Sequence, residues 1–229
     1  MTKSYDEAAQ QAAPVRTLAT LLAALLLTGA QGATAAGAEE AWKPELLPRE
    51  REIAAALAAG PASIAEAAGV FLLTEKGFML ERPSRNGFHC LVGRDQPGAF
   101  EPQCFDAEGS ETLLQAMLLA AELRARGHSA AEVARAVADG YASGRLRAPR
   151  RAGINYMLSR ENRVPVDDKG TVRPYRPHVM IYAPYLRNAD FGVAADGQSP
   201  VFVINEGRPG AYLIVPVPES PDHTHADSK

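Results

Sequence analysis

GFHCLVGRDQPGAFEPQCFDAEGSETLLQAMLLAAELRARG, residues 87–127, is the stretch that decides the fold. It predicts a strand, a loop and then the most apolar helix of the chain, with Ser110 as the helix cap because its hydroxyl can accept from a first-turn amide. A helix that is apolar around most of its circumference is typical of the middle of a domain, so we expect elements on several of its sides. One narrow polar stripe interrupts the apolar surface and consists of Glu111, Gln115, Glu122 and Arg126.

The same stretch holds both cysteines of the chain, Cys90 and Cys104. In an exported protein a lone pair of cysteines usually closes a disulfide, which for a loop of about 15 residues stabilises the fold by roughly 3 kcal/mol. The alternative is a nucleophilic thiol with His89 as its base, but neighbours on a strand point to opposite faces. The sequence therefore predicts a structural disulfide.

The N-terminal residues resemble an export signal. The apolar run 17–27 follows Lys3 and Arg16, and the small residues 33–35 have the A-x-A form of a cleavage site. Such a run is shorter than the roughly 20 residues that cross a bilayer, although a retained anchor is the alternative. We therefore expect a signal peptide over residues 1–36, no transmembrane segment after its cleavage, and a periplasmic or secreted protein.

The composition and the positions of the expected linker and tail predict one domain. The formal net charge of −3 lacks the basic excess of nucleic-acid-binding proteins, so we expect no nucleic-acid partner. Residues 37–48 are interpreted as a linker, residues 49–218 as a single domain with its own core, and residues 219–229 as a disordered tail. No metal or nucleotide motif occurs in the sequence, so neither a metal nor a cofactor is expected.

Periodicity predicts an α+β fold, a mostly antiparallel sheet packed on a central helical hairpin. The second helix of the hairpin begins at the capping box of Ser129 and Glu132 and reaches about Tyr141. An earlier helix covers residues 49–59, and three N-terminal strands are expected to form a meander. The expected strands are 70–74, 78–82 and 88–92, then 154–158, 178–183, 201–205 and 211–215.

The richest group of polar side chains follows residues 177–190, PHVMIYAPYLRNAD. A histidine beside a carboxylate is the minimum for general acid–base chemistry, which makes His178 with Asp190 or Glu206 the catalytic candidates of a hydrolase-like enzyme. The alternative is a neutral structural histidine that is buried and bonded to the backbone. The candidate ligand-binding residues of the same region are Tyr182, Tyr185 and Asn188.

Four arginines gather around Pro149 and form a candidate anion-binding segment. They could contact phosphate or, weakly, an anionic lipid surface. The alternative is a solvated connector between elements. The four residues are Arg145, Arg147, Arg150 and Arg151.

Three motifs resemble uncharacterised exported bacterial proteins: CLV at 90–92, CFDAEGS at 104–110 and HVMIYAPY at 178–185. The resemblance implies an exported single-domain protein and carries no particular activity. Our first hypothesis is therefore an exported domain that binds an unknown ligand or protein partner. The hydrolase-like enzyme is the alternative, and the sequence leaves open whether the protein is an enzyme.

Overall fold

The computed structural model describes residues 43–167, 170–193 and 199–217, all within one compact unit, Glu39–Lys229. The predicted signal peptide (1–36), the first part of the linker and the predicted tail (219–229) lie outside the described residues. The helices are α1 (Arg49–Leu57), α2 (Ala62–Ala65), α3 (Ala107–Glu111), α4 (Leu113–Ala125), α5 (Ala130–Ala142) and the 3-10 helix η1 (Asn188–Phe191). The strands are β1 (Gly69–Thr74), β2 (Gly77–Arg82), β3 (His89–Gly93), β4 (Glu101–Phe105), β5 (Ile154–Met157), β6 (Arg163–Pro165), β7 (Val172–Pro174), β8 (His178–Tyr182), β9 (Phe202–Ile204) and β10 (Tyr212–Pro216).

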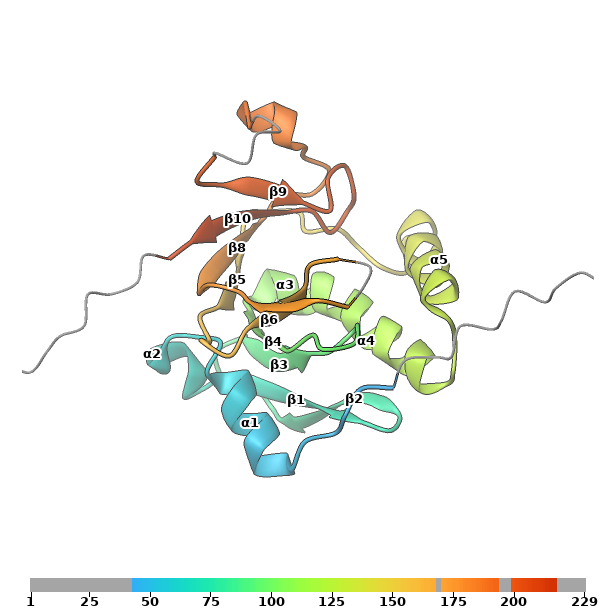
Figure 1. The fold of residues 1–229 in the computed structure, drawn as a ribbon, viewed down its shortest axis with the longest axis vertical. Helices are drawn as coiled ribbons and strands as arrows, with labels where there is room; N and C mark the ends of the chain where they lie inside the picture. Colours follow the sequence, from blue (N-terminus) through green and yellow to red (C-terminus); the bar gives the residue numbers. More distant parts are fainter. Residues whose placement is uncertain (1–42, 168–169, 194–198, 218–229) are drawn as a thin grey trace, which may run out of the picture. The chain divides into compact units, whose positions relative to one another are not determined.

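Eight of these strands form one sheet in the order β2-β1-β3-β4-β5-β8-β10-β9, while β6 and β7 form a separate hairpin (Figure 1). Every neighbouring pair in the large sheet is antiparallel except β1 and β3. The predicted α+β class with a mostly antiparallel sheet is therefore confirmed. The junction between β4 and β5 is short, since only Cys104 with Tyr156 and Phe105 with Asn155 are paired there.

The first three strands do not form the predicted meander. β1 and β2 make a hairpin, but β3 pairs with β1 in parallel, with Gly69 opposite His89, which leaves β2 at the sheet edge. The end of β2 is tied back to the start of β1, because the guanidinium of Arg82 donates to the carbonyl oxygens of Ala65 and Ala68. The chain therefore enters β3 beside the beginning of β1 and runs in the same direction.

Strand alternation divides the core between two faces of the sheet. On one face Cys90 and Val92 pack with the alanines of α1, and on the other Leu91 packs with Phe105 and with Leu114 of α4. The predicted disulfide is confirmed: Cys90 and Cys104 are directly opposite each other on β3 and β4, with their Cα atoms 4.1 Å apart. The bridge lies fully buried beneath α1.

Ser110 does not cap the central helix. Asp106 caps a separate short helix, α3, because its Oδ1 accepts from the backbone N–H of Gly109 at 2.9 Å. The helical conformation is interrupted at Thr112, and α4 begins at Leu113. Ser110 is buried, with its hydroxyl 3.1 Å from Nδ1 of His89. Aspartate and serine are both favourable helix caps, so the sequence pattern alone did not distinguish Asp106 from Ser110, and the prediction of Ser110 was wrong.

The helical hairpin is present, but its first helix is less enclosed than its composition predicts. α4 lies against β2, α5 lies against α4, and the capping box of Ser129 and Glu132 starts α5 as expected. Only Leu113 and Leu114 of α4 are buried. Along the part of the chain that the structure describes, no helix combines the length and the apolar character of a membrane span.

Candidate functional site

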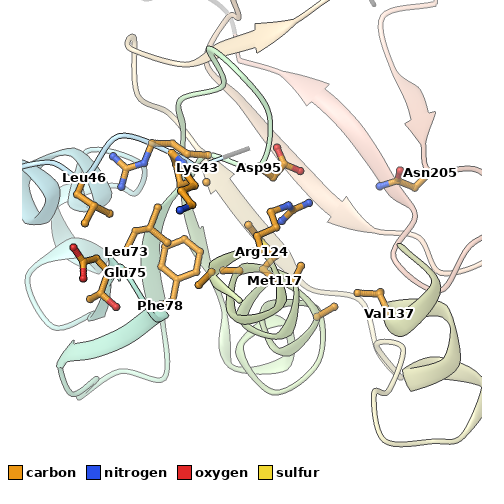
Figure 2. A pocket seen from close by; sticks show the side chains of 18 residues that line it. Lys43, Leu46, Leu73, Glu75, Phe78, Asp95, Met117, Arg124, Val137 and Asn205 are labelled. Carbon is orange, nitrogen blue, oxygen red and sulfur yellow. The ribbon is translucent and has the colours of Figure 1, made fainter. Parts of the chain in front are cut away.

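A groove of about 830 Å³ runs along α4 and is here called the α4 groove (Figure 2). One wall comes from Leu73 of β1 and Phe78 of β2, and the opposite end reaches Val137 of α5 and Asn205 after β9. This volume lies within the range of about 300–1,000 Å³ that is typical of small-molecule sites. The groove is therefore large enough for a ligand.

Small side chains of α4 create the space. Ala116 and Ala120 are four residues apart, as are Ala121 and Ala125, so these positions follow one side of the helix. From Ala116 to Ala125 the helix rises by about 13 Å. A methyl group cannot fill the distance to the facing elements, which leaves an apolar floor as long as two and a half turns.

Gly77 fixes how closely the hairpin wall approaches α4. Its φ of 99° is in the left-handed region, and a Cβ at this position would lie 2.9 Å from the backbone nitrogen of Glu122. Any other residue would push β2 away from the helix. The glycine at the start of β2 thus closes the groove on the side of the hairpin.

Two cations converge on the groove from different elements. Lys43 enters from the chain that precedes α1, and Arg124 rises from α4 with its guanidinium on the side of Asp95 (Figure 2). Neither forms an ion pair or hydrogen bond with another residue that the structure describes. Two carboxylates, Glu75 and Asp95, also lie on the lining.

Asp95 also affects the protonation of a neighbouring carboxyl group, that of Glu101. The pKa of Glu101 on β4 is raised to about 8, mainly by burial and further by the nearby Asp95 carboxylate. At neutral pH Glu101 is therefore mostly protonated, and the negative charge on this side comes from Asp95.

A buried ion pair lies next to the groove. Nη2 of Arg94 lies 2.5 and 2.6 Å from the two carboxylate oxygens of Glu52 on α1, and both side chains are more than nine-tenths buried. Nε and Nη1 of Arg94 have no hydrogen-bond partner among residues 43–167, 170–193 and 199–217. The pair fixes the start of the loop after β3, where Arg94 and Asp95 border the groove together with Gly93 at the end of the strand.

The structure does not bring the three catalytic candidates together. His178 begins β8, whereas Asp190 and Glu206 lie beyond the opposite end of that strand, and five strand residues separate the two ends by about 13 Å. Asp190 accepts from the backbone N–H of Arg187, and Glu206 accepts from Asn188. His178 is 3 % exposed, and its Nδ1 donates to the carbonyl oxygen of Arg176 at 2.8 Å.

We expect His178 to act as a neutral structural residue, so acidification should weaken the fold. Burial lowers the pKa of the imidazole, and the bond to Arg176 only partly opposes this. Below the unfolded value near 6.5 the unfolded chain takes up a proton that the folded ring resists, so stability is retained above that pH and lost below it. Urea unfolding at about pH 8 and pH 5.5 should show a larger loss for the wild type than for His178→Gln. A His178 contribution that grows at the lower pH would contradict this role.

The three candidate ligand-binding residues do not line the α4 groove. Tyr182 is buried, with its hydroxyl 2.7 Å from the carbonyl oxygen of Ile154. Tyr185 is 59 % exposed and has a positive φ of 66°. The side-chain amide of Asn188 bonds to the backbone of Val203 and to Glu206, which joins the start of η1 to β9 and to the turn after it.

The arginine segment is partly engaged in internal contacts. Arg151 Nε lies 3.0 Å from the buried carboxylate of Glu108, and the backbone N–H of Arg150 donates to the same carboxylate at 2.8 Å. Arg145 reaches the carbonyl oxygen of Ala136 at 3.4 Å, while Arg147 is exposed. Glu108 is therefore an internal anionic partner for the side chain of Arg151, one of the four arginines.

The fold and the groove together define an α+β protein with a ligand-sized groove beside its central helix. Comparison of the chain with protein-family models, with curated proteins and with solved structures finds no match. Within the described ranges, no cluster of three or more His, Cys, Asp or Glu side chains has the arrangement of a metal site.

Sequence reasoning missed the groove. One signal was present, since the alanines of α4 recur at a spacing of four and end beside Arg124. These alanines were counted as core-facing because they are apolar, although their size leaves a gap. The other lining residues come from positions as distant as Lys43 and Asn205, and only the folded chain brings them together.

Proposed function

We propose that this protein is a non-enzymatic binding protein whose α4 groove takes an amphipathic small molecule. The observation that carries the proposal is the groove itself, a continuous apolar floor of α4 alanines with two cations that have no partners among the described residues. Sites of this kind hold a ligand by apolar contact and orient it with a few polar groups. No observation favours the hydrolase-like alternative, because His178 contacts neither of its candidate carboxylates.

Export from the cytoplasm is part of the proposal. It is supported by the buried disulfide, because such bridges persist mainly in oxidising compartments. It is also supported by the signal-like residues 17–35 of the sequence. The proposed place of action is therefore the periplasm or the exterior of the cell.

A neutral solvatochromic dye, Nile red, tests the groove without regard to charge. We expect the purified full-length protein to bind the dye with a blue-shifted emission, and Ala120→Trp to weaken binding at least tenfold by filling the groove. Ala134→Trp places the same side chain at an exposed position of α5 and should bind like the wild type. Thermal unfolding of both variants would establish that they are folded. Equal dye binding by wild type and Ala120→Trp would overturn the proposal.

A further inference from the structure

We infer that the ligand of the α4 groove is a single alkyl chain that carries an anionic head, with a carboxylate as its simplest form. In this arrangement the head lies between Lys43 and Arg124, and the chain lies along the alanines of α4. The inference rests on the proposed function of the groove and specifies the chemical class that it binds.

The position of the two cations favours an anionic head. Lys43 and Arg124 approach the same part of the groove from separate elements (Figure 2), and neither is neutralised by a neighbour within the described part of the chain. Two like charges that point toward one space repel each other, and an anion between them removes that repulsion. Arg124 is half-buried, so its interaction with an anion is screened less than at an open surface.

Neither carboxylate on the lining forms an ion pair with Lys43 or Arg124. Figure 2 shows Glu75 beside Leu73 at the hairpin end, directed away from Arg124. Asp95 lies on the loop after β3, on the side toward which the Arg124 guanidinium points (Figure 2), but makes no ion pair with it within 4 Å. Burial and the nearby Asp95 carboxylate raise the pKa of Glu101 to about 8, so Glu101 is largely neutral at pH 7, which limits the negative charge near the head. A cationic head would meet Lys43 and Arg124 directly.

The shape of the floor favours one extended chain. The alanines run for two and a half helical turns, and Met117 and Phe78 line the same trough. The floor offers a length of about 13 Å along the helix axis, which suits one extended chain. Each methylene of an alkyl chain placed there loses contact with water, which is the main source of affinity for such ligands.

The test compares three ligands with the same ten-carbon chain, which matches the length of the floor: decanoate, decanol and decyltrimethylammonium, each below its aggregation limit. Displacement of Nile red from the full-length protein gives the affinities. We expect the carboxylate to bind at least tenfold more tightly than the alcohol, and the ammonium compound to bind most weakly. Arg124→Gln should remove most of the carboxylate's advantage, and Arg124→Glu should reverse the order in favour of the ammonium head.

Arg126→Gln serves as the matched control. Arg126 lies near Arg124 on the chain but outside the groove, where it pairs with Glu122, so its loss should leave the order of the three ligands unchanged. If the three ligands bind with equal affinity and Ala120→Trp still prevents their binding, this inference is overturned and the proposed function stands. Absence of binding by all three ligands and by the dye would remove both. A charge preference that survives Arg124→Gln and Lys43→Gln would place the head elsewhere and also overturn the inference.

Discussion

Replacing Asp106 with alanine is expected to lower the free energy of unfolding by about 3–5 kcal/mol, since it removes several charge-assisted hydrogen bonds at once. Oδ1 of Asp106 accepts from the backbone N–H of Gly109 and lies 2.9 Å from the hydroxyl of Tyr182. Oδ2 accepts from the backbone N–H of Ile154 at 3.0 Å. One carboxylate therefore holds the start of α3, the start of β5 and the end of β8 together.

The space around this carboxylate leaves no room for a compensating shift. A Cβ added at Gly109 would lie 2.0 Å from the Tyr182 hydroxyl, so α3 already packs against that ring without clearance. Water that entered after Asp106→Ala would have to replace partners on three separate elements. Tyr182→Phe leaves both backbone bonds of the carboxylate in place, although it also removes the contact of the hydroxyl with the carbonyl oxygen of Ile154, and it should cost less than half as much.

Urea unfolding at neutral pH measures both effects. Asp139→Ala, the same substitution at an exposed position of α5, is the control and should change stability little. A loss below about 1 kcal/mol for Asp106→Ala would mean that the carboxylate does not join these elements.

The second large effect is expected at the buried ion pair. Arg94→Met should destabilise the protein by about 3–5 kcal/mol, because it leaves the carboxylate of Glu52 buried without its partner. The double variant Glu52→Leu with Arg94→Met should recover most of that loss, since two apolar side chains of similar size can replace a buried pair. The guanidinium already lacks partners for Nε and Nη1 among the described residues, which favours this recovery.

A double-mutant cycle of the two single variants and the double variant gives the coupling energy. Arg126→Met breaks an exposed pair of the same type, with Glu122, and should have little effect. If Arg94→Met and the double variant lose the same stability, the pair is held by its surroundings and not by mutual attraction.

Local patterns in the sequence predicted the elements that depend on neighbouring residues. The alternation around Cys90 placed the disulfide on one face of β3, and the capping box at Ser129 located the start of α5 correctly. Strands β4, β6 and β7 were not predicted, but β5, β8, β9 and β10 were found because proline and glycine separate short apolar runs. In each case the information lies within about ten residues of the element.

Features that depend on distant residues were not predicted. The parallel pairing of β1 with β3 follows from bonds between Arg82 and the residues before β1, and no local pattern indicates them. The choice of Asp106 over Ser110 as a cap depends on Tyr182 and Ile154, which are far away in the sequence. His178 and Asp190 were grouped because they are near in sequence, although a strand lies between them.

The short junction between β4 and β5 has a consequence for the order of folding. Strands β1 to β4 come from residues 69–105 and the remaining strands of the large sheet from residues 154–216, so each half can form by closing relatively short loops. Contacts between the halves close a longer loop, because β4 ends at Phe105 and β5 begins at Ile154, so we expect them to form after the contacts within each half. The α4 groove takes Leu73 from one half and Asn205 from the other, and it is therefore complete only when that last step is finished.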